Sequence, residues 1–312
     1  MDLPAWFRPS IVHTVGSPNN INEWSDTMYA VAGATGRVGA ATARHLLENG
    51  AEVRVLVRDR ERAEEWMRRG AEARVVDLGD RAALRDAITG CDGLFVLLPF
   101  DLTVDDLDAY ADAITASVAG AVADSGISHV VMLSAGGADL PDGTGPIAGL
   151  HRMEHALQAT GTVLTALRSG HFQEKVGDLI AAARAGVYPV FAASADVPLP
   201  MVATRDLGAT AAMALLSPDV ASTSIDVVGP ACSEREVATA LGAALGRELE
   251  VVVLPEDAWA PALIDAGFRP HVAASLAELS RADERGMLAP RGDLAVRVET
   301  SIEATIAGLI AA

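Results

Sequence analysis

The sequence predicts an α/β protein built on a doubly wound parallel sheet, with a smaller, mostly helical α/β lobe in the second half of the chain. Between residues 29 and 134, short apolar runs alternate with segments of helical composition. Units of this length form parallel strands joined by right-handed crossover helices, which cover both faces of the sheet. A glycine-rich turn after the first run is a second indication, because ligands of such sheets bind beyond the carboxyl ends of the strands.

The elements of this sheet can be followed along the chain. Apolar runs favour strands and alanine-rich segments favour helices. Expected strands occupy residues 29–32, 51–57, 73–78 and 93–99, with a fifth that ends at Ser134, and expected helices occupy residues 40–49, 81–88 and 104–123. After about residue 172 the rhythm breaks into helices, a proline-bearing stretch and the strands "STSIDVVG" and "LEVVVLP". We therefore divide the chain into an N-terminal extension (1–27), a main domain (28–170) and a smaller lobe (171–312), from which some segments return to the main sheet.

The turn "GATGRVG" has the composition of a dinucleotide-binding loop. Gly33 permits positive φ, Gly36 lets the backbone approach a ligand, and Gly39 lets the following helix pack closely on the strand. The start of that helix presents free N–H groups, which bind anions. A strand, this turn and a helix in succession predict a Rossmann-type domain, although glycines alone often form ordinary turns.

The residue after the second strand indicates which dinucleotide binds. An NAD-binding domain usually carries an acidic residue there, which reaches the ribose hydroxyls. This chain has Arg58 instead. An arginine at this point favours a 2′-phosphate, and we therefore expect NADPH as the cofactor.

The composition narrows the classes of partner. A formal net charge of −18 argues against nucleic acids and anionic membranes, because phosphate contacts need clustered positive charge. Cys91 and Cys232 lack the spacing of metal ligands, so no metal site is expected. No apolar run approaches the roughly 20 residues that span a bilayer. We expect a cytoplasmic monomer or homodimer that acts on a small molecule.

Several further motifs, in a fixed order, identify a family. They are "GATGRVG", "LVRD" (56–59), "VVDLGD" (75–80), "VMLSAGGA" (131–138), "MEHALQATGTVLTALRSGHF" (153–172), "ATRDLGATAA" (203–212) and "DVVGPACSEREVATALGAALGR" (226–247). With these motifs the chain resembles the NmrA-like proteins, which are atypical short-chain dehydrogenases/reductases. That family includes NAD(P)H:quinone oxidoreductases, isoflavone-reductase-like enzymes and regulators that sense dinucleotides.

The resemblance implies roles for individual residues. The dinucleotide turn would consist of Gly33, Thr35, Gly36, Arg37, Val38 and Gly39. Arg58 would meet the 2′-phosphate, and Asp77 and Leu78 would flank the adenine. The nicotinamide ribose would lie over Leu97, Leu98 and Pro99.

The catalytic residues of the wider family are missing. Most short-chain dehydrogenases use a Tyr-x-x-x-Lys pair, in which the lysine helps the tyrosine to pass a proton to a carbonyl. The three tyrosines of this chain do not lie about a dozen residues after Ser134, where the pair would begin. His151 lies within about one residue of the usual lysine position and is the first candidate for the acid, with His171 in reserve and Ser134 as a hydrogen-bonding residue.

Three functions remain open at this point. The first is an NADPH-dependent reductase of a quinone-like or conjugated carbonyl compound, because an easily reduced acceptor has less need of a strong acid. The second is a non-catalytic regulator that senses dinucleotides, as the missing pair suggests. The third is a tailoring reductase, cyclase or epimerase of secondary metabolism.

Overall fold

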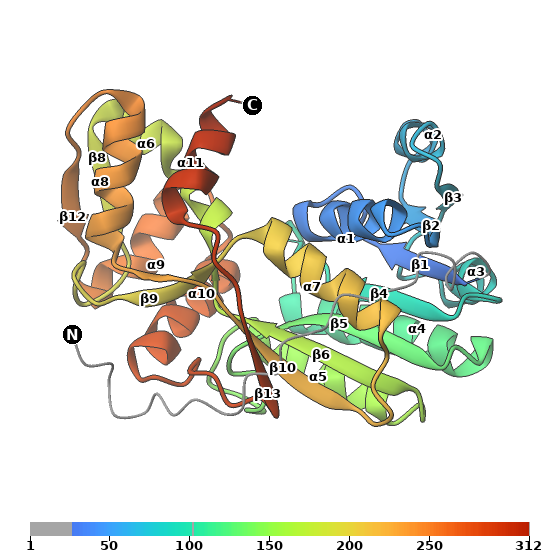
Figure 1. Cartoon of the computed structure of the whole chain (residues 1–312). Coiled ribbons are helices and arrows are strands. Elements are labelled where there is room, and N and C mark those ends of the chain that lie inside the picture. Colours follow the sequence, from blue (N-terminus) through green and yellow to red (C-terminus); the bar gives the residue numbers. More distant parts are fainter. Residues whose placement is uncertain (1–26, 102, 312) are drawn as a thin grey trace.

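The computed structural model describes residues 27–101 and 103–311 (Figure 1). The predicted N-terminal extension therefore lies outside the described residues, except for Thr27. Two bodies are visible in Figure 1: a layered α/β body, and a smaller lobe that carries the C-terminal helix.

In the described part of the chain, eight parallel strands form the central sheet in the order β13-β10-β6-β5-β4-β1-β2-β3. The six strands from β3 to β6 have the 3-2-1-4-5-6 order of the dinucleotide-binding fold, and this confirms the predicted fold class. Their bounds are β1 (Met28–Ala32), β2 (Glu52–Val57), β3 (Glu72–Val75), β4 (Gly93–Leu97), β5 (His129–Ala135), β6 (Val163–Ser169), β10 (Thr223–Val228) and β13 (Leu294–Arg297).

Helices cover both faces of this sheet because every central strand is apolar on both sides. Successive residues of β1 point to opposite faces of the sheet, so Ala30 and Val31 belong to two different cores. One core includes α1 (Arg37–Glu48), α2 (Arg60–Met67) and α7 (Thr204–Leu216). The other includes α3 (Arg81–Ile88), α4 (Leu107–Ser125) and α5 (Ile147–Gln158).

Aspartates fix the starts of three crossover helices. Asp59, Asp80 and Asp106 each accept a hydrogen bond from a backbone N–H in the first turn of α2, α3 and α4. This N-cap satisfies a donor that the helix itself leaves unpaired. The helix α1 has no such cap, since its N-cap residue is Gly36.

The smaller lobe is built from short elements around its own apolar core. Its strands form the sheet β11-β9-β7 and the pair β12-β8. The bounds are β7 (His171–Phe172), η1 (Gln173–Leu179), α6 (Ile180–Ala185), β8 (Val187–Val190), β9 (Leu199–Val202), β11 (Ala231–Cys232), α8 (Glu234–Leu245), β12 (Glu250–Val253), α9 (Glu256–Asp265), α10 (Pro270–Glu284) and α11 (Ile302–Ala311).

The two strands predicted in the second half of the chain belong to different sheets. "STSIDVVG" is β10 of the main sheet, whereas "LEVVVLP" is β12 and pairs with β8 in the lobe. The edge strand β13 was not identified from the sequence. A run of four residues at a sheet edge, three of them half-buried and the last exposed, has a weak apolar signal.

The helix α1 lies against α7 at very short range. A Cβ atom at Gly208 of α7 would overlap the Cβ of Ala41 and would lie 2.8 Å from the backbone N of Thr42. Both neighbours belong to α1, so no flexible side chain can move aside. Gly208 therefore sets the distance between the two helices.

We predict that Gly208→Ala lowers the free energy of unfolding by about 1–3 kcal/mol, the usual cost of overpacking a core. Gly308→Ala is the matched control in α11, because a Cβ there meets nothing within 4 Å. Alanine is also the better helix former, so the control should be neutral or slightly stabilising. Denaturant unfolding measures both variants, and equal stabilities would contradict the close packing.

Candidate functional site

The turn after β1 has the geometry that its glycines predict. Gly33 has φ of 67°, a value that favours glycine. A Cβ at Gly39 would overlap the carbonyl oxygen of Gly33 and would lie 2.8 Å from that of Ala32. Both conformational predictions are confirmed, and α1 consequently begins directly above the end of β1.

The N-terminus of α1 is suited to an anion. No side chain caps it, and its first turn carries no acidic residue. Its free N–H groups and the positive end of the helix dipole favour a negatively charged ligand. The indole N–H of Trp66 donates to the carbonyl of Ala34 at 3.2 Å and so ties the turn to α2.

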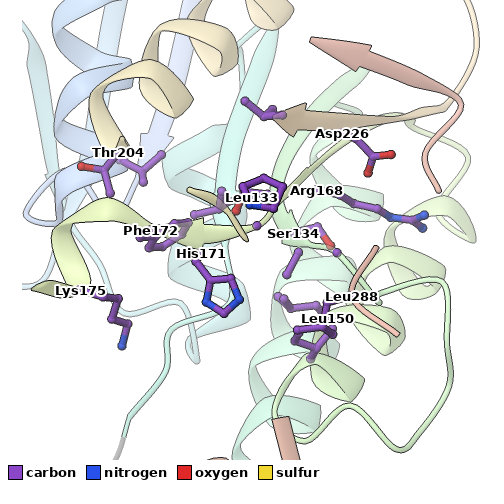
Figure 2. Close-up of a pocket in the computed structure, with 18 of the residues that line it drawn as sticks. Leu133, Ser134, Leu150, Arg168, His171, Phe172, Lys175, Thr204, Asp226 and Leu288 are labelled. Carbon is purple, nitrogen blue, oxygen red and sulfur yellow. The ribbon is translucent and has the colours of Figure 1, made fainter. Parts of the chain in front are cut away.

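A cavity of about 720 Å³ opens beside this turn. It extends from the turn after β1 over the carboxyl ends of β4, β5, β6 and β10. The strand order reverses between β1 and β4, and ligands of this fold bind beyond the carboxyl ends at such a point. Its wall is largely apolar, with a few polar groups drawn in Figure 2. A cavity of this size and polarity holds a cofactor or small organic ligand. The apolar lining includes Leu97, Leu98, Leu133, Ile147, Leu150, Phe172, Leu199, Leu279 and Leu288.

The cavity brings together about half of the residues that the sequence singled out. Those that line it are Gly36, Arg37, Val38, Gly39, Leu97, Leu98, Ser134 and His171. Those that do not line it are Gly33, Thr35, Arg58, Asp77, Leu78, Pro99 and His151.

Arg58 and Asp77 lie on the side of β2 and β3, beyond the cavity. Arg58 is exposed. Its positive charge favours the ionised forms of Asp101 and Tyr110, two residues that follow β4. Asp77 also acts on Tyr110 and accepts the backbone N–H of Gly79 at 2.7 Å.

His151 is held by the backbone. Its Nδ1 lies 2.9 Å from the carbonyl oxygen of Ala138, and its ring contacts that of His155 with centroids 4.1 Å apart. The neighbouring Leu150 lines the cavity and His151 does not. The helix α5 contains neither tyrosine nor lysine.

Ser134 belongs to a buried polar network beneath the cavity. Its hydroxyl donates to Oε1 of Glu154 at 2.5 Å. Arg168 holds the same carboxylate with Nε at 3.1 Å and Nη2 at 2.6 Å. Because Glu154 is buried, the two-point pairing balances its charge. The hydroxyl oxygen of Ser134 can still accept a hydrogen bond from a ligand.

His171 forms an ion pair with Asp283 across the cavity wall. Its Nε2 lies 2.9 Å from Oδ2 of Asp283, and both residues line the cavity. Burial by itself would lower the pKa of His171. The hydrogen bond to Asp283 and the negative charges of Asp283 and Glu234 have the larger effect, so the pKa of His171 is raised. Lys175 opposes the rise. The pair with Asp283 thus favours the protonated form of His171 in a largely apolar cavity.

Three charged residues of the site were not assigned roles from the sequence. Arg168 and Asp226 interrupt the apolar strands β6 and β10, and a charge inside a buried strand could have drawn attention to both. Asp283 had no such signal. It lies 112 residues from His171, and only the folded chain brings the two together.

A comparison with models of protein families identifies the family of this chain. The model of the NmrA-like family matches residues 25–307. This chain belongs to the NmrA-like family. The resemblance inferred from the motifs is therefore confirmed.

Two relatives of known activity match most of this NmrA-like chain. It is 30% identical over 256 residues to the NAD(P)H azoreductase of Xenophilus azovorans, covering 81% of this chain and 86% of the relative. It is 33% identical over 264 residues to the (4-alkanoyl-5-oxo-2,5-dihydrofuran-3-yl)methyl phosphate reductase of Streptomyces griseus, with 83% and 88% covered.

Solved structures share the fold. The triphenylmethane reductase of Citrobacter sp., complexed with NADP(H), has a TM-score of 0.74 at 20% identity and covers 91% of this chain and 99% of its own. The NADPH-dependent quinone oxidoreductase of Escherichia coli, complexed with NADPH, has a TM-score of 0.71 at 22% identity, with 91% and 100% covered.

Two features are absent from the described residues. No helix there is both long and apolar enough to cross a membrane. No group of three or more His, Cys, Asp or Glu side chains could hold a metal ion.

Proposed function

We propose that this chain is an NADPH-dependent reductase that transfers hydride to a flat, conjugated acceptor of the quinone type. One observation carries the proposal: a single cavity joins an uncapped helix N-terminus to a largely apolar chamber that is lined by His171 and its ion-pair partner Asp283. The two reductases that match most of the chain support the same class of chemistry.

The residues of the turn fit a dinucleotide. A pyrophosphate on the first N–H groups of α1 would replace the missing cap, and the glycines leave room for it. Arg37 lines the cavity beside this helix start. Arg58 would bind the 2′-phosphate, and Asp77 and Leu78 would border the adenine.

The chamber next to the turn fits a nicotinamide and an acceptor. When bound, NADPH supplies the hydride. Leu97 and Leu98 would support the nicotinamide ribose, and the apolar wall excludes water from the reacting atoms. The hydroxyl of Ser134, with its proton directed to Glu154, would accept a hydrogen bond from the ligand.

Hydride transfer to a carbonyl leaves negative charge on oxygen, which then needs a proton. We assign this proton to His171. An imidazolium donates near neutral pH without the lysine that a tyrosine needs. Asp283 keeps the ring charged and fixes Nε2, so the proton would leave from Nδ1.

The absorbance of NADPH, followed with a series of quinones and enones, tests the proposal. We expect oxidation that depends on both enzyme and acceptor. Tight NADPH binding without turnover of any acceptor would contradict it and would leave the dinucleotide sensor as the function. Turnover of a single specialised substrate, and of no simple quinone, would favour a secondary-metabolism enzyme.

Arg58→Ala is predicted to weaken NADPH much more than NADH. A hydrogen bond from arginine to phosphate is charge-assisted and contributes about 1.5–3 kcal/mol, or roughly 10- to 100-fold in affinity. Arg44→Ala is the control, because this exposed arginine of α1 donates to the carbonyl of Ala40 and does not line the cavity. Calorimetry with both cofactors measures the ratio, and equal losses would exclude Arg58 as the phosphate ligand.

His171→Phe is predicted to lower turnover of a poorly activated carbonyl about 10²- to 10⁴-fold, the usual range for a general acid, without changing NADPH affinity. His151→Phe should retain turnover, since His151 does not line the cavity. The opposite pattern would restore His151 as the acid.

Activity should also depend on pH through the ion pair of His171 and Asp283. The acid must be protonated, so turnover falls as pH rises through the pKa of His171, which Asp283 raises. Asp283→Asn removes that charge, and the fall should then begin at lower pH. An unchanged pH profile would show that Asp283 does not act on the acid.

A further inference from the structure

Arg168 and Asp226 lie side by side in the cavity wall. They are register partners on the neighbouring strands β6 and β10, and both line the cavity. Both are shielded from bulk solvent: 11% of the Arg168 side chain and 5% of Asp226 are exposed. Figure 2 shows both residues on the opposite side of His171 from Lys175.

These two opposite charges do not pair with each other. Arg168 uses Nε and Nη2 to hold Glu154, and no ion pair within 4.0 Å joins it to Asp226. Asp226 accepts the backbone N–H of Gly292 at Oδ2, 2.6 Å away. Each side chain is thus anchored at one end, away from its neighbour.

One polar atom of each residue is left over. Nη1 of Arg168 and Oδ1 of Asp226 have no hydrogen-bond partner among the described residues. Neither atom is sealed from solvent, since the sealed and unpartnered side-chain atoms of the described chain are those of Thr115, Ser117, His129, Thr144 and His271. A free donor and a free acceptor, more than 4.0 Å apart, therefore lie on register-paired residues that both line the cavity.

The net charge decides which ligand group suits this end. Glu154 already balances Arg168, so the three residues together carry one negative charge when Asp226 is ionised. Burial raises the pKa of Asp226, while the hydrogen bond from Gly292 and the charge of Arg168 oppose the rise. A carboxylate on the ligand would meet this excess negative charge, whereas a neutral group with an N–H donor would not.

We propose that Arg168 and Asp226 form a substrate subsite for a neutral group with a hydrogen-bond acceptor next to a donor, as in a primary carboxamide. Nη1 of Arg168 donates to the carbonyl oxygen, and Oδ1 of Asp226 accepts an N–H. The subsite rests on the proposed function, for which it narrows the substrate to a conjugated acceptor with an amide-like substituent. Leu150 and Leu288 contribute to the apolar wall of the same cavity.

Binding to the enzyme–NADP⁺ complex tests the subsite without turnover. The probes are two naphthoquinones, one with a primary carboxamide and one with the N,N-dimethylcarboxamide, which keeps the acceptor and lacks the donor. Calorimetry is done in mildly alkaline buffer, which favours the ionised form of Asp226 because burial raises its pKa. We expect the primary amide to bind about 10- to 100-fold more tightly, as for a hydrogen bond to a charged group.

In Asp226→Asn the amide oxygen should keep the hydrogen bond from the N–H of Gly292, so an NH2 donor replaces the free acceptor with almost no change in shape. This change should abolish the preference. Asp139→Asn is the matched control: it removes a nearby charge, paired with Arg291, from a residue that does not line the cavity. The control should keep the wild-type preference. Thermal unfolding checks that both variants are folded, and Asp226→Leu repeats the test if the asparagine variant is not.

Two results would overturn the subsite: equal affinity of the wild type for the two amides, or a preference that persists in Asp226→Asn and so arises from the bulk of the methyl groups. Failure of the proposed function is a separate outcome. In that case no acceptor oxidises NADPH, although the amide preference and its loss in Asp226→Asn remain measurable.

Discussion

The placement of α1 is the constraint on which the site depends. Gly39 lets the start of the helix rest on the end of β1, and Gly208 lets α7 press on its other side. Neither contact leaves room for a Cβ, so the helix cannot shift without a clash. Its uncapped N-terminus is consequently fixed beside the cavity, where its free N–H groups can act on a ligand.

The second half of the chain completes the cavity from the other side. His171 follows β6, Asp226 belongs to β10, and Asp283 comes from α10. Segments that lie far apart in sequence thus supply the polar groups that would touch an acceptor. This division explains how one cofactor turn can serve many substrates, because the lobe can change while α1 and the first strands keep their packing.

Local patterns predicted the first part of this arrangement well. The glycine turn and the first five strands depend on neighbouring residues, and the structure contains all of them. The polar groups opposite the turn depend on tertiary contacts. Position in the family motif favoured His151, yet the geometry favours His171, because its pairing with Asp283 cannot be read from a sequence. The roles of the individual site residues remain predictions.

The central claim is that one cavity holds NADPH and an acceptor in contact. A single-turnover experiment with NADPH deuterated at the reactive C4 position tests it most directly. If hydride passes straight from the nicotinamide to a bound quinone, deuterium must slow the oxidation of enzyme-bound NADPH when the quinone is added. Equal rates for the two isotopes at every quinone concentration, or no oxidation at all, would contradict the account.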